Sequence, residues 1–153
     1  MLSPGRGEEW SAIVSASESF SERLAGRVLA PAGGNLVLAE WTADGRPDPN
    51  EPPVHQAPLH AHTDDEAWYV LEGTLGIRIG DDEVEVPAGG AAIVPGGTPH
   101  TYWNPRPEPA RYLLVMGAAT YALIQALHAQ RPGWGSDAMK QLFGEHGATF
   151  LDA

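Results

Sequence analysis

Two histidines one residue apart precede an acidic run in the segment PLHAHTDDEAWYVLEG, residues 58–73. In a strand, His60 and His62 point to the same face, because side chains alternate with a period of two. Glu66 begins the next apolar run after a turn-like Thr-Asp-Asp, so its carboxylate can return to that face. His100, just after a turn rich in Gly and Pro, supplies a third imidazole. Burying these four groups together without compensation costs several kcal/mol, which a divalent cation offsets by binding the carboxylate charge and the imidazole lone pairs.

Two aromatic residues are expected to point to the same strand face as these candidate ligands. From Glu66 the same face continues through Trp68 and Val70, and Tyr102 follows His100 by two residues. We therefore predict Trp68 and Tyr102 as walls of a substrate pocket, with packing in the core as the alternative.

Other polar residues near the candidates or in the tail are given structural or surface roles. Turn chemistry explains Asp64 and Asp65 beside the candidate ligands and Asn104 after the third histidine. A lone histidine in a loop or helical tail is more often exposed or packed than bound to a metal. The residues assigned in this way are Asp64, Asp65, Asn104, His55, His128 and His146.

Short strands must position these residues. The chain of 153 residues holds 18 Gly and 14 Pro, which punctuate short apolar runs and do not cluster in one tract. This punctuation is typical of many strands joined by turns. Residues 46–54 form a proline-rich loop, and the runs at 66–73, 74–80 and 82–89 are predicted to form a meander. The other predicted strands lie within 34–45, 91–97, 100–104 and 111–117.

After Gly117 the apolar period changes to that of helices. The first predicted helix ends at RPGWG, residues 131–135. The second has Ser136 as its N-cap and Gly144 or Gly147 near its end. The sequence therefore predicts a strand-rich core followed by a helical tail.

The charge balance excludes two classes of partner. Lys and Arg number 9 against 20 Asp and Glu, a formal net charge of −11. Nucleic acid and anionic lipid both require clustered basic residues, so we expect neither as a partner. No apolar run is long enough to span a bilayer and the first residues have no secretory apolar region, so a cytoplasmic protein is expected. The absence of cysteine excludes disulfides and thiolate zinc sites.

Two segments carry a family resemblance. Residues 60–73 resemble the first motif of the cupin superfamily, and residues 89–104 resemble the second. Val54 stands where the first motif usually opens with glycine, a departure that concerns the entry turn and not the ligands. The matching positions are His60-x-His62-x3-Glu66-x6-Gly73 and Gly89-x5-Pro95-x-Gly97-x2-His100-x3-Asn104.

The resemblance implies an all-β fold, a small double-stranded β-helix (jelly-roll) barrel with a C-terminal helical tail. We expect an N-terminal arm at 1–33, the cupin β-barrel at 34–117 and the C-terminal helices at 118–153, within one domain. It also implies that Gly73 and Gly97 adopt turn conformations closed to residues with a β-carbon.

The resemblance further implies one divalent transition metal. Its ligands would be His60, His62, Glu66 and His100. Nitrogen and oxygen ligands of this kind are compatible with iron, manganese, nickel, cobalt, copper or zinc. In the alternative, the barrel has lost its metal, as in some members of the superfamily, and the histidines and glutamate only hydrogen-bond to one another.

Three classes of function stay open. Single-domain cupins with this ligand set and a helical tail are similar to quercetin-dioxygenase-like proteins, which implies a metal-dependent dioxygenase acting on a small enediol or aromatic substrate. In that oxidoreductase Glu66 is also the candidate base. The first alternative is a non-oxidative isomerase, decarboxylase or cyclase that uses the metal as a Lewis acid. The second alternative is a small-molecule binding module without turnover.

A homodimer is also expected. The resemblance implies it, and sheet edges need to be covered.

Overall fold

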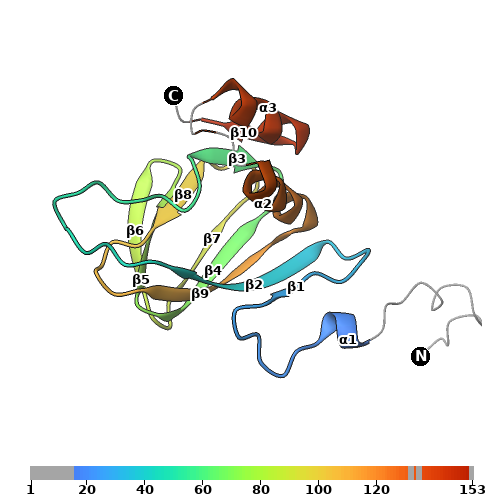
Figure 1. The fold of residues 1–153 in the computed structure, drawn as a ribbon, viewed down its shortest axis with the longest axis horizontal. Helices are drawn as coiled ribbons and strands as arrows, with labels where there is room; N and C mark the ends of the chain where they lie inside the picture. Colours follow the sequence, from blue (N-terminus) through green and yellow to red (C-terminus); the bar gives the residue numbers. More distant parts are fainter. Residues whose placement is uncertain (1–15, 131–132, 134–135, 152–153) are drawn as a thin grey trace, which may run out of the picture.

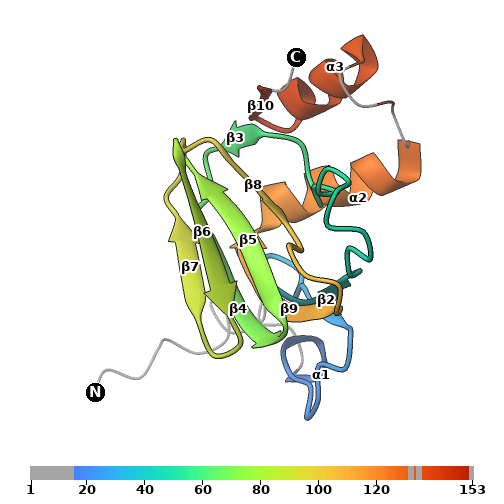
Figure 2. The same cartoon turned by 90° about the vertical axis from the view of Figure 1, so that its left-hand side faces the viewer.

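A computed structural model describes residues 16–130, 133 and 136–151 of the chain. Within these residues the chain folds into two five-stranded antiparallel sheets, with helices α2 and α3 near one end (Figures 1 and 2). One sheet has the order β1 (Val28–Leu29), β2 (Leu36–Ala43), β9 (Ala110–Gly117), β4 (Glu66–Glu72), β7 (Ala91–Val94). The other has the order β10 (Ala148–Phe150), β3 (His60–His62), β8 (His100–Trp103), β5 (Thr74–Ile79), β6 (Asp82–Pro87).

The core lies between the two sheets. Strand β9 alternates buried and half-buried residues along its whole length, as expected for a strand with one face inward. Its buried face meets residues from the opposite sheet, among them Leu75 and Ile77 of β5. Burial of this apolar surface at about 25 cal/mol per Å² is the main force that holds the sheets together.

The predicted meander of three consecutive strands is wrong. Strands β5 and β6 form a hairpin, but β4 pairs with β9 and β7 in the other sheet. The chain changes sheets at Gly73, whose φ is 76°. A β-carbon there would lie 2.6 Å from the carbonyl oxygen of Pro109. Gly73 and Gly97, with a φ of 83°, thus both adopt the left-handed conformation predicted for them.

The tail is helical as predicted. Helix α2 spans Ala118–Gln130 and α3 spans Asp137–Glu145. The Ser136 hydroxyl accepts a hydrogen bond from the backbone N–H of Met139 at 3.1 Å, which confirms the predicted N-cap. After α3 the chain adds strand β10, which the sequence did not predict, to the edge of β3.

The two helices share a small apolar core of their own, built on Leu123 of α2 and on Met139, Leu142 and Phe143 of α3. None of the helices in the described residues is long and apolar enough to cross a membrane.

The N-terminal arm predicted at 1–33 is described only in part. Residues 1–15 lie outside the described residues. The rest contains a single helical turn, α1 (Ala16–Ser19), and β1, which pairs with β2.

Candidate metal centre

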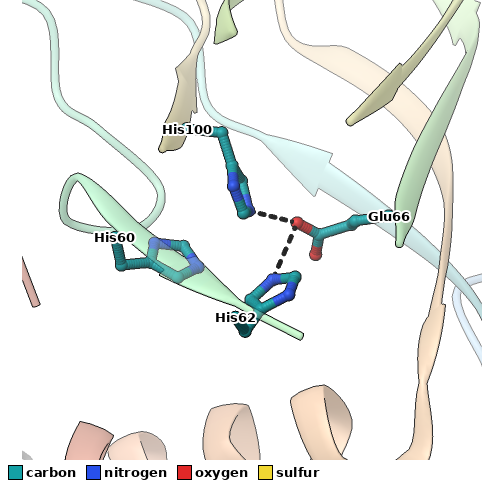
Figure 3. A group of neighbouring side chains, drawn as sticks. All are labelled: His60, His62, Glu66 and His100. Carbon is teal, nitrogen blue, oxygen red and sulfur yellow. Dashed lines mark hydrogen bonds and ion pairs between the residues drawn. The ribbon is translucent and has the colours of Figure 1, made fainter. Parts of the chain in front are cut away.

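The structure brings His60, His62, Glu66 and His100 together inside the barrel (Figure 3). One ligand atom from each lies within 4.8 Å of the others, and all four side chains are buried. The first two come from β3, while Glu66 begins β4 in the opposite sheet and His100 begins β8. Strands β3 and β8 are neighbours, with His60 directly opposite His100 in the register. Period-two alternation therefore brings three imidazoles and a carboxylate to one point.

Hydrogen bonds fix the tautomer of all three rings. Each Nδ1 lies within hydrogen-bond distance of a backbone carbonyl two residues away, and a carbonyl oxygen can only accept. Each Nδ1 therefore carries a hydrogen, and in the neutral ring Nε2 presents a lone pair to the cluster. The acceptors are the carbonyl oxygens of Pro58 for His60 (2.6 Å), Asp64 for His62 (2.9 Å) and Thr98 for His100 (2.8 Å).

With these tautomers the cluster contains imidazole lone pairs and a carboxylate, and no positive charge to bind them. His100 Nε2 lies 2.7 Å from Oε2 of Glu66, and His62 Nε2 lies 3.5 Å from the same oxygen. The second distance is too long for a good hydrogen bond, so the buried His62 Nε2 has no hydrogen-bond partner in the described part of the chain. A single proton would satisfy one of these contacts, whereas a divalent cation accepts lone pairs from all the groups. The four residues fit a divalent transition metal.

The electrostatics favour the ligating protonation states of Glu66 and His60. Burial raises the pKa of Glu66, but the hydrogen bond with His100 and the closeness of His62 outweigh it and lower the pKa to about 2. Burial, with the charge of His100 second, lowers the pKa of His60 to about 4. Burial lowers the pKa of His62 as well, but its contact with Glu66 raises the pKa overall. At neutral pH the carboxylate is therefore ionised and His60 is neutral, as metal ligation requires.

Asp64 supports the centre in a way that the sequence analysis missed. Its carbonyl accepts from His62, and its carboxylate accepts from the backbone N–H of Thr120 at 3.3 Å and from the Thr120 hydroxyl at 3.1 Å. Gly117 precedes α2 and has no side chain to cap it, so a residue from another loop takes that role. A β-carbon on Gly117 would lie 2.1 Å from the Asp64 carboxylate. Asp64 thus ties a candidate metal ligand, His62, to helix α2.

A cavity of about 280 Å³ opens beside the cluster, and His60 and Glu66 both line it. The C-terminal helices line it with four apolar side chains, Leu123, Ile124, Leu127 and Phe143, and with the polar Thr120 and His128. The helical tail therefore builds part of the site instead of only following the barrel. Among the described residues that line the cavity, none is Lys or Arg.

The two predicted pocket residues occupy different depths. Tyr102 lines the cavity. Trp68 is 1% exposed and lies behind the cavity wall. The centroid of its ring is 5.4 Å from that of Tyr102 and 6.0 Å from that of His100. Tyr112, which the sequence analysis did not single out, also lines the cavity, and its hydroxyl lies 2.8 Å from that of Tyr102. Burial raises the pKa of Tyr102 well above its usual value and that of Tyr112 to about 12, so both phenols stay protonated at neutral pH.

The remaining histidines lie outside the cluster. His55 packs edge-on against Trp103, with ring centroids 5.3 Å apart. His146, the C-cap of α3, makes a 2.9 Å hydrogen bond through Nδ1 to the carbonyl of Leu142 in that helix. His128, in contrast, lines the cavity from α2, a position that its helical spacing alone did not reveal.

Asn104 has the turn role predicted for it. Its side-chain amide donates to the carbonyls of Ala43 and Glu108, and its oxygen accepts from the N–H of Arg106.

Comparison with known proteins agrees with the motifs. Residues 51–116 match the family model Cupin_2, the cupin domain. The match supports the cupin superfamily, and the jelly-roll fold implied by the two motifs is confirmed by the paired antiparallel sheets. No curated protein matches the chain.

Several solved structures resemble part of this chain. One from Thermus thermophilus is 28% identical, with a TM-score of 0.46 over 54% of this chain and 72% of that chain. A Klebsiella pneumoniae protein with a double-stranded β-helix domain is 22% identical, with a TM-score of 0.47 over 69% and 89%. The polyketide cyclase RemF from Streptomyces resistomycificus is 30% identical, with a TM-score of 0.47 over 60% and 62%. The match therefore spans less than two thirds of the cyclase.

Proposed function

We propose that this cupin is a metal-dependent dioxygenase that acts on a small enediol or aromatic substrate. The observation that supports it most is the opening of the four-ligand cluster onto an apolar, aromatic-walled cavity. His60, His62, Glu66 and His100 would hold the metal. Iron, manganese, nickel, cobalt or copper would supply redox chemistry and two positions for dioxygen and a chelating substrate, since four protein ligands leave two positions of an octahedral ion open.

The position of Glu66 suits a substrate with a hydroxyl group. Its buried carboxylate belongs to the ligand cluster and also lines the cavity. Substrate bound in the cavity would therefore place its hydroxyl beside this carboxylate, which can accept a proton. Glu66 is assigned to hold the substrate hydroxyl proton.

The cavity favours a flat, apolar substrate. Leucine, isoleucine and phenylalanine side chains from α2 and α3 cover one side, and the Tyr102 and Tyr112 rings form another part of the wall. Burial of an aromatic ring against such walls excludes water from the reacting groups.

Oxygen uptake tests the proposal. We expect protein reconstituted with each of the redox-active metals in turn to consume oxygen with at least one flavonol or diketone of a small panel, in proportion to substrate loss. Zinc-loaded protein should consume none. His60→Ala should lose the activity, while His146→Ala, a matched change outside the cluster, should retain it. Absence of uptake with every metal and substrate would contradict the proposal.

One observation favours a non-oxidative alternative. His128 lines the cavity but is not part of the ligand cluster, so it offers an imidazole for proton transfer while the metal acts as a Lewis acid. Turnover that persists without oxygen and with zinc would identify this isomerase, decarboxylase or cyclase class. A small molecule that copurifies and is recovered unchanged would instead identify a binding module.

We also propose a homodimer through the outer face of the β1-β2-β9-β4-β7 sheet. Leu38, Val115, Ala67 and Ile93 form one apolar row across four paired strands of this face, and Ile93 is 66% exposed. An apolar contact suits two copies that each carry a net charge of −11. Sedimentation should give a dimer for the wild type and a monomer for Ile93→Glu; a wild-type monomer would contradict the proposal.

A further inference from the structure

Two phenol hydroxyls meet in the wall of the cavity that His60 and Glu66 also line. Tyr102 comes from β8 and Tyr112 from β9, so the pair joins the two sheets across the inside of the barrel. Their hydroxyl oxygens are 2.8 Å apart, and the residues are 7% and 2% exposed. The rings meet edge to face with centroids 5.5 Å apart, and Trp68 packs behind Tyr102. Both hydroxyls are therefore held in fixed positions.

One of the two hydroxyl hydrogens of this pair is not used in the bond between the tyrosines. Each phenol carries one hydrogen, and the bond between the two hydroxyls uses only one of them, whichever residue donates it. Within the described residues, neither hydroxyl has a second hydrogen-bond partner. A buried donor without an acceptor is costly, so the free hydrogen favours an acceptor placed in the cavity.

We propose that the Tyr102–Tyr112 pair is the hydrogen-bond donor for an oxygen of the substrate. This inference rests on the proposed function, because it takes the cavity as the substrate site. The two hydroxyls and the metal ligands line the same cavity, so one small molecule can reach both. Tyr102 and Tyr112 then determine specificity: they select a substrate with an oxygen acceptor on an apolar frame.

The surroundings of the pair narrow the substrate class further. Among the described residues that line the cavity, no Lys or Arg is present to neutralise a phosphate or a second carboxylate, and His128 is the one imidazole there outside the ligand cluster. Burying such a charge without a partner costs several kcal/mol. An enolate or phenolate bears one delocalised charge, which the metal and one phenol donor together stabilise. The structure thus assigns the site to singly charged aromatic or enolic oxygen compounds rather than to phosphate esters or dicarboxylates.

Binding of 4-nitrocatechol to zinc-loaded protein tests this inference without turnover. The visible absorbance of this catechol reports ionisation of its hydroxyls, and zinc removes any oxidative chemistry. We expect the double variant Tyr102→Phe, Tyr112→Phe to bind the probe about tenfold to a hundredfold more weakly than the wild type, the range for one hydrogen bond to a charged oxygen. The two single variants then show which phenol donates, by the greater loss. Zinc affinity should not change, because neither tyrosine belongs to the ligand cluster.

Tyr69→Phe is the matched control, since it removes the same hydroxyl from a residue that is 45% exposed. Wild-type affinity in the double variant would overturn the inference and reduce the pair to a link between sheets. An equal loss of zinc affinity would overturn it as well, because the effect would then act through the metal. Failure of the wild type to bind zinc would instead refute the proposed function together with this inference.

A second measurement uses only the wild type and so does not depend on whether the variants fold. The affinity of each compound for the zinc-loaded protein is divided by its affinity for free zinc. On this scale 4-nitrocatechol should bind at least about tenfold more tightly than oxalate, because oxalate adds a second charge to a cavity without Lys or Arg. Equal or reversed preference would overturn the assigned substrate class.

Discussion

Replacing His100 with alanine is expected to abolish stoichiometric metal binding. Four protein ligands typically share about 10–16 kcal/mol of metal-binding free energy, so the loss of one costs about 3 kcal/mol, or more than about a hundredfold in affinity. Alanine also leaves Glu66, which is 5% exposed, without its 2.7 Å partner. Removal of one partner from a buried charged pair destabilises a fold by about 3–5 kcal/mol, so the metal-free variant should also unfold at lower temperature.

Metal content after dialysis and competition with a chelator measure the first effect, and thermal unfolding of metal-free protein measures the second. His146→Ala is the control, because this histidine bonds to the end of α3 and lies outside the cluster. Wild-type metal affinity in the His100→Ala variant would show that the cluster is not the site. If the wild type itself takes up no ion after supplemented expression, the four residues are only a hydrogen-bonded group.

The sequence was sufficient to predict which four side chains form the cluster, because their placement depends on local periodicity. His60 and His62 share a face of one strand, and the positions of Glu66 and His100 follow from turns that start the next strands. The same rule explains why the meander prediction is wrong. Alternation shows which side chains of β4 point inward but not which sheet contains the strand.

Contacts between distant segments could not be predicted in this way. Tyr112 reads as one more apolar position of a strand, and its hydroxyl gains significance only opposite Tyr102 on the other sheet. Asp64 has the sequence context of a turn residue, and its cap on α2 becomes visible only when Thr120 is placed beside it. The alternation of side chains along β4 also placed Trp68 on the inward face but could not give its depth behind the cavity wall.

The second large effect is expected from Gly96→Ala, and the same change at the adjacent Gly97 is its control. A β-carbon on Gly96 would lie 2.1 Å from the carbonyl oxygen of Thr63, so Gly96→Ala must displace the backbone next to His62. Gly97 has a φ of 83° but open space around its α-carbon, so Gly97→Ala meets only the conformational penalty of about 1–2 kcal/mol. Both changes add one methyl group, and only the first forces the loop at residues 63–65 to move.

Movement of that loop should reach the metal through His62. The Asp64 carbonyl that orients the His62 ring lies one residue beyond Thr63, and Gly97 donates a 2.7 Å hydrogen bond to the His62 carbonyl. Loss of an outer partner of a ligating histidine typically weakens metal binding about 10–100-fold, and we expect that loss for Gly96→Ala. We also expect about 1–3 kcal/mol of overpacking strain in this variant's unfolding free energy. Gly97→Ala should lower stability but keep metal affinity within about threefold of the wild type, because the Asp64 carbonyl still supports the His62 ring. Chelator competition on both variants decides the matter: equal metal affinities would show that the 63–65 loop does not hold His62 in its ligating orientation.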